Sequence, residues 1–464
     1  MPLLFHAFST AKHFYVFDAN TNSVISVSGE QHAALSQIEQ GRETQENLVV
    51  LRELQAKGFC REANIERIHN PNTDVMAAHL EKKIQQIIIQ VTQRCNLRCD
   101  YCAYSGLYKN RTHSPKSMSF ETAKRAIDMA LSHSEDTKIF IISFFGGEPL
   151  LELPLIKKCV EYIKRQAPNR NILYSMTTNG TLLTPEVYGY LSDNNFNIAI
   201  SLDGPKQIHD MSRKYPNGKG SYDTIMENIK AIQAQYPKSC DKLRFNAVLS
   251  PEADESCLPK LFKSDDVLSY YNHNATTVSD VYIDNPVSYS DAFSLCFDRE
   301  LCKLLLSMLG KLEKENVSVL FSTRETTIKQ EYNRLIKIPR INPVCHPGGP
   351  CLAGAMRPFV NVEGILFPCE RVSENSQLMA IGDLDHGFDF EKVRTVMNPG
   401  QVTEEQCKKC WVINHCTLCA AYSDDLTGLS KRVRLSNCRK ARSRYEETLK
   451  ILCFLKEAGY AFAN

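Results

Sequence analysis

The sequence lacks the features that mark several common classes of protein. Neither charge is in excess, because 55 Lys and Arg face 53 Asp and Glu, so composition points neither to nucleic acid nor to a membrane surface as a partner. No apolar run is long enough to span a bilayer, and the opening MPLLFHAFSTAKHF has neither a sustained apolar segment nor a small-residue cleavage site. We therefore expect a cytoplasmic protein.

Cysteine, in contrast, is abundant, with 18 residues in a chain of 464. The cytoplasm keeps thiols reduced, and a chain of this length, for which about three domains are expected, does not need disulfides for stability. Metal binding is the better explanation. Eleven cysteines fall into the two groups described below. The other seven are expected to be small buried hydrophobic residues, and they are Cys60, Cys159, Cys240, Cys257, Cys296, Cys302 and Cys453.

The pattern of apolar and turn-forming residues predicts four segments. Residues 1–80 show two β-rich runs around DANTN and two short helices, which predicts a winged-helix-like domain. Residues 81–290 alternate between strand-like and helical runs, and residues 291–340 are predicted to form a helical bridge. Residues 341–464 are dense in Cys, Gly and Pro before a last amphipathic helix, so this segment is expected to fold around metal.

The second segment contains six strand-like runs, which predict an α/β fold class. They cover residues 87–91, 139–145, 172–177, 197–202, 243–249 and 278–283. Amphipathic stretches separate the first five, and Ser119 and Thr184 are expected to cap two of the helices. Six βα units imply a parallel sheet but are too few for a closed eight-stranded barrel. We therefore predict a partial (β/α)6 TIM barrel whose chemistry lies at the carboxyl ends of its strands.

Three cysteines follow the first of these strands, in the stretch VTQRCNLRCDYCAYSG. Cys95, Cys99 and Cys102 fall on a loop at the carboxyl end of the strand, and thiolates this crowded suit an iron–sulfur cluster. Four thiolates would saturate a four-iron cluster, whereas three leave one iron open to a chelating small molecule. A zinc site that borrows a distant fourth ligand, or chance clustering, is the alternative.

The CxxxCxxC spacing, with the aromatic Tyr101 as a cofactor-site residue before the last cysteine, resembles the signature of the radical S-adenosylmethionine (SAM) enzymes. This resemblance implies that the amino acid part of SAM chelates the open iron. FFGGEP, at residues 144–149 after the second strand, is similar to the family's GGEP element and implies that Gly146, Gly147 and Glu148 meet the SAM amino group. Glycines let backbone groups approach a ligand, and a carboxylate pairs with an ammonium group.

Two further segments end the next two strands, as the SAM-contacting segments of this family do. They are TTNG at residues 177–180 and SLDGP at residues 201–205. The resemblance implies that Asn179, Ser201, Asp203 and Arg213 also contact SAM, the last three at its ribose and carboxylate. Each segment alone is most simply a turn, but four elements in order at successive strand ends indicate the family.

Eight more cysteines lie between residues 345 and 438, and FVNVEGILFPC among them predicts a hairpin that turns at Glu363-Gly364. Their spacing resembles the SPASM extension of peptide-modifying radical SAM enzymes, which implies two auxiliary clusters and therefore three 4Fe-4S clusters in all. The implied ligands are Cys345, Cys351, Cys369 and Cys419 for one auxiliary cluster, and Cys407, Cys410, Cys416 and Cys438 for the other. Two residues separate Cys416 from Cys419, where the family usually has three, and a pair of structural zinc sites is the alternative.

The resemblance also implies an activity and partners. In the family, reductive cleavage of SAM, fed by an electron donor such as flavodoxin or ferredoxin, gives a 5'-deoxyadenosyl radical that abstracts a hydrogen atom from the substrate. The first 80 residues resemble the domain that binds the leader of ribosomally made precursor peptides (RiPPs) by adding a strand to a sheet edge. We expect a maturase of cysteine-rich peptides, of the sactionine or ranthipeptide type, that forms thioether crosslinks.

Other functions remain open at this stage. The chain could form a carbon–carbon crosslink, or oxidise Cys or Ser to formylglycine as in sulfatase maturation. A binding module with purely structural clusters is a different class, against which the GGEP and SLDG segments argue. No nucleic acid or membrane partner is expected, and no catalytic side chain is assigned.

Overall fold

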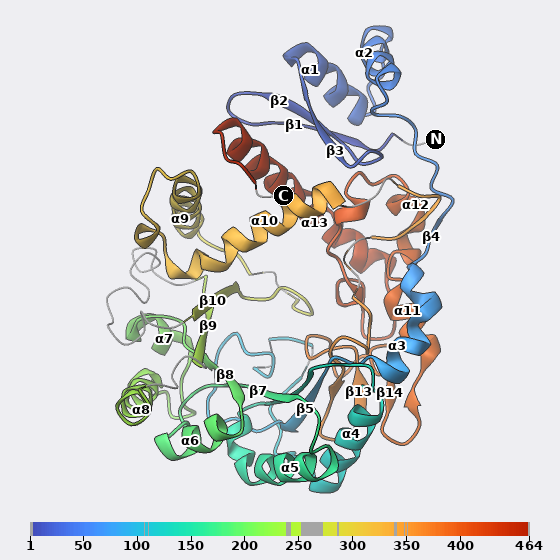
Figure 1. The fold of residues 1–464 in the computed structure, drawn as a ribbon. Helices are drawn as coiled ribbons and strands as arrows, with labels where there is room; N and C mark the ends of the chain where they lie inside the picture. Colours follow the sequence, from blue (N-terminus) through green and yellow to red (C-terminus); the bar gives the residue numbers. More distant parts are fainter. Residues whose placement is uncertain are drawn as a thin grey trace.

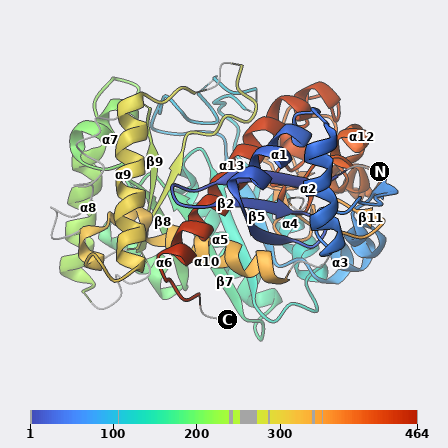
Figure 2. The ribbon, with the colours of Figure 1, turned by 90° about the horizontal axis from the view of Figure 1, so that it is seen from above.

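The computed structural model describes residues 3–105, 107–109, 111–237, 243–251, 272–284, 287–337, 341–347, 349 and 351–462. A small N-terminal sheet with two helices lies at one end of the molecule, and a larger sheet covered by helices lies at the other (Figure 1). The last helix, α13 (Lys431–Glu457), packs against the small sheet, where Glu457 accepts hydrogen bonds from Thr10 and Tyr15 (Figure 2).

The N-terminal sheet is antiparallel and consists of β1 (Phe5–Ser9), β2 (Phe14–Asp18) and β3 (Ser23–Val27). Helices α1 (Gly29–Glu39) and α2 (Gln45–Ala56) follow, each started by a capping box, on Ser28 and on Thr44. The predicted hairpin and both predicted helices are therefore present, and β1 is an additional strand. Because β2 lies in the middle, β1 and β3 are the edges of this sheet.

Six parallel strands extend from one edge of the larger sheet, at β10, to β5, and the first five lie where they were predicted. In chain order they are β5 (Gln86–Thr92), β6 (Phe140–Gly146), β7 (Ile172–Thr178), β8 (Phe196–Ser201), β9 (Leu243–Leu249) and β10 (Asn272–Thr277), and each pairs with the next. The helices that connect the first five are α4 (Phe120–Ser132), α5 (Leu153–Gln166), α6 (Pro185–Asp193), α7 (Lys206–Ser212) and α8 (Tyr222–Gln235) (Figure 1). Ser119 and Thr184 cap α4 and α6 as predicted. The carboxyl ends of the parallel strands lie at one edge of the sheet.

The prediction for the sixth strand, at residues 278–283, is wrong. The strand is β10, whose sequence NHNATT ends before that stretch begins. β10 pairs only with β9 and forms the edge of the sheet, so it does not need the apolar residues of a strand with two neighbours. The apolar residues of VSDVYI instead follow β10 in a loop.

The C-terminal segment continues the same sheet. β12 (Phe359–Val360) pairs parallel with β5, and β13 (Ile365–Phe367), β14 (Gly382–Asp383) and β15 (Gly387–Phe388) follow as antiparallel neighbours. The hairpin between β12 and β13 turns at Gly364, whose φ of +86° suits glycine, as predicted. Phe359 and Leu366 belong to the same hydrophobic core as the parallel strands. The second cysteine region is therefore anchored on the central sheet.

The remaining elements connect these parts. Helix α3 (Met76–Lys82) precedes β5, and α9 (Asp291–Met308) and α10 (Ser322–Lys337) occupy the predicted helical bridge. β4 (Arg67–Ile68) pairs with β11 (Val344–Cys345), and two short helices, α11 (Phe390–Met397) and α12 (Glu404–Cys407), precede α13. Within the described ranges, no helix has the length and apolar character required to cross a membrane.

Candidate functional site

The three cysteines of the CxxxCxxC stretch lie on a loop that leaves the carboxyl end of β5. The Leu97 N–H donates to Cys95 Sγ at 3.4 Å, Asn179 Nδ2 approaches the same sulfur at 3.9 Å, and the Tyr104 N–H donates to Cys102 Sγ at 3.4 Å. Hydrogen bonds to sulfur are one way in which a protein sets the potential of an iron–sulfur cluster. The donor groups around these sulfurs therefore fit thiolates that ligate such a cluster.

Cys99 is the most deeply buried of the three cysteines. Burial raises the pKa of its thiol to about 12; Arg213 opposes the rise, and the neighbouring Cys102 and Cys95 add to it. The three thiols are therefore close enough to act on one another. A bound metal would displace their protons, because thiolate is the ligating form.

The two glycines of GGEP lie against the cysteine loop. The N–H of Gly147 donates to the carbonyl of Thr92 at 2.9 Å, and the N–H of the next residue donates to the carbonyl of Arg94 at 2.8 Å. A Cβ atom would lie 2.3 Å from the Thr92 oxygen at Gly146 and 2.1 Å from the Arg94 oxygen at Gly147. Glycine is therefore needed here for β6 to approach the cysteine loop, and contact of this backbone with SAM remains a prediction.

Glu148 is fully buried and connects the ends of β6 and β7. Its carboxylate accepts hydrogen bonds from the Leu150 N–H at 3.0 Å, the Thr178 hydroxyl at 2.7 Å and the Asn179 N–H at 2.7 Å. Burial raises the pKa of Glu148 to about 7, although these three donors favour the ionised form. The structure thus joins two of the predicted SAM contacts, Glu148 and Asn179, directly to each other.

Tyr101, Asp203 and Arg213 form a second buried group at the same edge. Arg213 Nε lies 2.9 Å from Asp203 Oδ2, and the Tyr101 hydroxyl donates to the same oxygen. The guanidinium also lies 5.4 Å from the centre of the Tyr101 ring. Ser201 is the last residue of β8 and is aligned with Asn246 of β9. The structure therefore gathers all the predicted SAM contacts at the carboxyl edge of the parallel sheet.

Residues 89–263 match the radical SAM superfamily. This match includes the cysteine loop, GGEP and the ends of β7 and β8. These segments lie together at the carboxyl edge of the parallel sheet. The central part of this chain therefore matches a radical SAM domain.

Relatives and solved structures extend this comparison. The cysteine-type anaerobic sulfatase-maturating enzyme of Clostridium novyi is 35% identical over 154 residues, which are 32% of this chain and 41% of that enzyme. The radical SAM cyclopropyl synthase TigE of Paramaledivibacter caminithermalis is 25% identical over 348 residues, 72% of this chain and 67% of that protein. The chain thus spans less than half the length of the first of these relatives.

A solved structure of native anSMEcpe with bound AdoMet has a TM-score of 0.59 and 21% identity, and the match covers 80% of this chain and 99% of that chain. The same protein has been solved with AdoMet and a Kp18Cys peptide. At this identity the comparison shows that the two proteins share a fold.

A cavity of about 140 Å³ outside the radical SAM domain is lined by Cys407, Cys410, Cys416 and Cys438. Arg434 of α13 also lines it and is 1% exposed. Its guanidinium donates to the Thr403 hydroxyl, the Leu418 carbonyl and the Ser423 hydroxyl, and no carboxylate among the described residues pairs with it. A buried cation requires a nearby anion. Four thiolates around an iron–sulfur cluster would supply one, so this cavity fits such a group.

Cys351, Cys369 and Cys419 form another group. Burial raises the pKa of Cys369 to about 12, and Glu370 and the thiols of Cys351 and Cys419 add to the rise. Cys345, which the resemblance assigns to this group, packs instead against the hydrophobic cluster that contains Cys407 and Cys416. The structure therefore places the implied fourth ligand of one group beside the other group.

Every cysteine among the described residues is free of disulfides, and these residues contain no three Cys, His, Asp or Glu side chains arranged around a single metal ion. Of the seven other cysteines, those buried as predicted are Cys60, Cys159, Cys296 and Cys453. The prediction is wrong for Cys302, which lies on the exposed face of α9. Cys240 and Cys257 lie outside the described residues.

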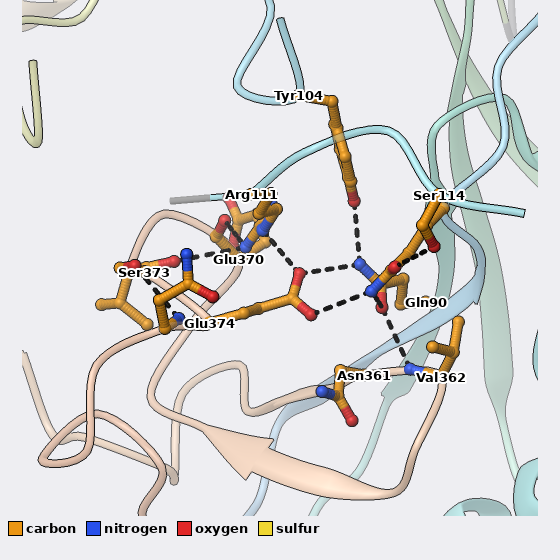
Figure 3. A network of polar contacts seen from close by, with 12 residues as sticks. Gln90, Tyr104, Arg111, Ser114, Asn361, Val362, Glu370, Ser373 and Glu374 are labelled. Carbon is orange, nitrogen blue, oxygen red and sulfur yellow. Dashed lines mark hydrogen bonds and ion pairs between the residues drawn. The ribbon is translucent and has the colours of Figure 1, made fainter. Parts of the chain in front are cut away.

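A buried polar network lies next to the cysteine loop (Figure 3). Arg111 and Glu374 form an ion pair with 2.6 Å between Nε and Oε1, and their side chains are only 3% and 8% exposed. Gln90 Nε2 donates to Glu374 and to the Tyr104 hydroxyl, in both cases at 2.8 Å. The rings of Tyr104, Phe145 and Phe359 surround the guanidinium. Sequence reasoning missed this network, because an ion pair 263 positions apart leaves no local pattern.

The network connects the two cysteine regions. The Arg111 guanidinium donates to the backbone carbonyl of Glu370 at 2.6 Å, and Glu370 directly follows Cys369. At the other side, Tyr104 lies two residues after Cys102. The loop that carries the first thiols is therefore held against the segment that carries Cys369.

Between the parallel sheet and this segment lies a cavity of about 300 Å³. Its lining is mostly polar and includes Ser143, Ser175, Asn197, Arg244, Asn246 and Asn274 from the strands. On the C-terminal side, Arg357 Nη2 pairs with Glu370 Oε1 at 3.1 Å. None of these residues was predicted. The signal in the sequence is the alternation of polar residues in strands such as LRFNAVL, since a parallel strand buried on both faces is normally apolar throughout.

Proposed function

We propose that this chain is a radical SAM maturase that forms thioether crosslinks in a ribosomally made, cysteine-rich precursor peptide. The observation that carries the proposal is that one chain combines a radical SAM domain, a second cysteine region and a small sheet with free edges. We assign residues 1–80 to leader binding, residues 81–290 to the radical SAM core and residues 291–340 to a bridge. Residues 341–464 are assigned to a SPASM-type domain with auxiliary clusters.

Three sets of thiols would hold three 4Fe-4S clusters. Cys95, Cys99 and Cys102 would hold the cluster that binds SAM. The cavity beside Arg434 would hold a second cluster, and Cys351, Cys369 and Cys419 a third, with Cys345 as the fourth ligand that the resemblance supplies. When bound, the first cluster and SAM supply a 5'-deoxyadenosyl radical that removes a hydrogen atom from the substrate.

The side chains at the carboxyl edge of the sheet would position SAM. Glu148 faces this edge as a buried carboxylate, so it suits the SAM amino group, together with the backbone of Gly146 and Gly147. Ser201, Asp203 and Arg213 are assigned to its ribose and carboxylate. Asp203 and Arg213 already pair, so SAM would add to an existing charged group rather than meet an isolated charge.

The polar cavity would take the reacting part of the peptide. It has a volume of about 300 Å³, at the small end of the usual range for ligand sites, and several of its lining side chains, such as Asn197 and Asn274, are exposed, so a peptide can enter it. Glu370 Oε2 is buried there and has no hydrogen-bond partner among the described residues. This oxygen can accept the proton that a substrate thiol loses as it becomes a thioether, and an auxiliary cluster would supply the acceptor for the one electron that is left.

The leader would pair with β3, an edge strand whose residues are mostly half-buried. Proline substitutions at Val24 and at Ile25 test this, because adjacent N–H groups of a strand face opposite sides. The proline that removes the outward N–H should weaken precursor binding at least about tenfold and leave reductive SAM cleavage unchanged. Unchanged precursor affinity in both folded variants would contradict leader binding at β3.

The chemistry is tested by incubating the iron-loaded protein with SAM, an electron donor such as flavodoxin, and a short cysteine-rich peptide sought among the open reading frames that neighbour its gene. Thioether formation predicts a loss of about two hydrogens per modification together with loss of a thiol that can be alkylated. Loss of two hydrogens with free thiols would instead show a carbon–carbon crosslink.

Formylglycine formation is the second candidate, favoured by the similarity to sulfatase-maturating enzymes and by the fold shared with anSMEcpe. The same experiment separates it from thioether formation. A cysteine converted to formylglycine loses its sulfur and gains an aldehyde, which a hydrazide reagent captures. A captured aldehyde without a crosslink would replace the thioether proposal with this one.

A further inference from the structure

The strand register orders the polar cavity into rows. Of the lining residues, Asn246 of β9 and Asn274 of β10 are aligned with each other and with Ser201, the last residue of β8. Arg244 is aligned with Ala199 in the next row, two residues further from the carboxyl edge of the sheet. Two residues of a strand span about 6.6 Å, so the backbone of Arg244 lies further from the carboxyl edge than Ser201, and its side chain is exposed in the cavity.

Arg244 is the unbalanced charge of this cavity. It has no ion-pair or hydrogen-bond partner among the described residues, whereas Arg357 on the opposite wall is balanced by Glu370. The other polar side chains that line the cavity from the strands are uncharged. The Arg244 side chain is exposed, so its N–H donors are accessible to a ligand that fills this space, and these donors suit a carboxylate in a bidentate arrangement.

We propose that Arg244 recognises a carboxylate of the substrate peptide, so that the residue modified by this enzyme lies next to an Asp or Glu side chain or to the C-terminal carboxylate. This inference rests on the proposed peptide-modifying function. Arg244 is a specificity-determining residue in this role, and the chemical step does not involve it.

The test uses the full-length, iron-loaded protein and three N-acetylated dipeptides that differ in the carboxylate that they carry. Ac-Cys-Asp-amide carries a side-chain carboxylate, Ac-Cys-Gly carries a terminal carboxylate, and Ac-Cys-Asn-amide carries neither. Their affinities are measured with SAM present, for the wild type, for Arg244→Gln and for Arg244→Lys. The matched control is Arg125→Gln, a surface arginine of α4 that pairs with Asp385. In parallel, the rate at which phenylglyoxal modifies Arg244 is followed by peptide mapping, with SAM alone and with each dipeptide.

We expect at least one carboxylate peptide to bind about tenfold more tightly than the Asn peptide and to protect Arg244 from phenylglyoxal. The preference should disappear in Arg244→Gln, return in part in Arg244→Lys and persist in Arg125→Gln. Equal affinities for all three peptides, or a preference that survives in Arg244→Gln, would overturn this inference and leave the proposed function standing. Protection by SAM alone would assign Arg244 to the SAM site instead. Failure of every peptide to bind, in all variants, would overturn this inference and leave the proposed function standing, because that function draws its affinity from the leader, which these dipeptides lack.

Discussion

The two cysteine regions each contain a buried arginine, but they balance its charge differently. In the radical SAM domain, Arg213 pairs with Asp203 at 2.9 Å, and Tyr101 donates to the same carboxylate. In the C-terminal segment, Arg434 meets only hydroxyl and carbonyl oxygens, with no carboxylate among the described residues. The first region is therefore balanced by protein groups alone, whereas the second needs an added anion.

The two regions also differ in how their thiols are brought together. Cys95, Cys99 and Cys102 share one loop after β5, so their proximity follows from spacing. The cavity beside Arg434 draws its cysteines from α12, the turns after it and α13. A local site can keep its shape without a cluster, whereas a site assembled from distant segments depends on what those segments enclose.

The largest effect is expected from removing the local site. Replacing Cys95, Cys99 and Cys102 together with Ala should abolish reductive cleavage of SAM and leave about eight of about twelve irons, because the other two sites use different thiols. Iron analysis and detection of 5'-deoxyadenosine check this. Cys302→Ala, which changes an exposed cysteine of α9, is the control and should alter neither. Loss of all iron in the triple variant would show that the two regions are not independent.

The next largest effect is expected at the network that joins the regions. Arg111→Leu leaves Glu374 buried without its partner, which should lower the free energy of unfolding by about 3–5 kcal/mol in urea denaturation. Arg111→Leu combined with Glu374→Leu should recover part of this loss. Arg125→Leu breaks the exposed pair with Asp385 and should cost less than about 1 kcal/mol. Equal losses for the buried and the exposed pair would show that Arg111 does not hold the regions together.

A smaller effect is expected at Glu148, because burial raises the pKa of its carboxyl group to about 7. The carboxylate attracts the SAM ammonium group only when ionised, so SAM affinity should increase as the pH rises from about 6 to about 7.5. Glu148→Gln should weaken SAM binding about tenfold at the higher pH and remove this pH dependence. Glu152→Gln, at a nearby carboxylate paired with Arg94, should retain it. A pH dependence that persists in Glu148→Gln would assign it to another group.

The smallest effect is expected at Arg434, the buried arginine of α13 that has no carboxylate partner among the described residues. Arg434→Met removes a buried positive charge from the thiol-lined cavity, so the reduction potential of the cluster held there should become more negative, on the order of tens of mV. Potentiometric titration followed by electron paramagnetic resonance measures this. Arg442→Met removes an exposed charge from the same cavity and should shift the potential less, because solvent screens it. If every cluster potential of the protein is unchanged in Arg434→Met, no cluster lies in this cavity.

Much of the fold and the radical SAM site follows from local sequence. The first five parallel strands, the caps at Ser119 and Thr184 and the turn at Gly364 depend on neighbouring residues, and the structure has them where predicted. The polar edge strand β10 was misplaced, because an edge strand leaves no apolar run to recognise. The positions of Asn179 and Asp203 after successive parallel strands were enough to expect them at one edge.

The sequence by itself determined which groups stand at the ends of the strands, because spacing along the chain and the direction of parallel strands decide that. Only the tertiary structure decided which partners surround those groups and balance their charges. It placed three hydrogen-bond donors around Glu148 and a carboxylate beside Arg213. It placed no carboxylate of the described residues beside Arg244 or Arg434. It also brought Cys345 next to the hydrophobic cluster that contains Cys407. These outcomes depend on which distant segments pack together, and packing between segments far apart in the chain leaves no periodic pattern in the sequence.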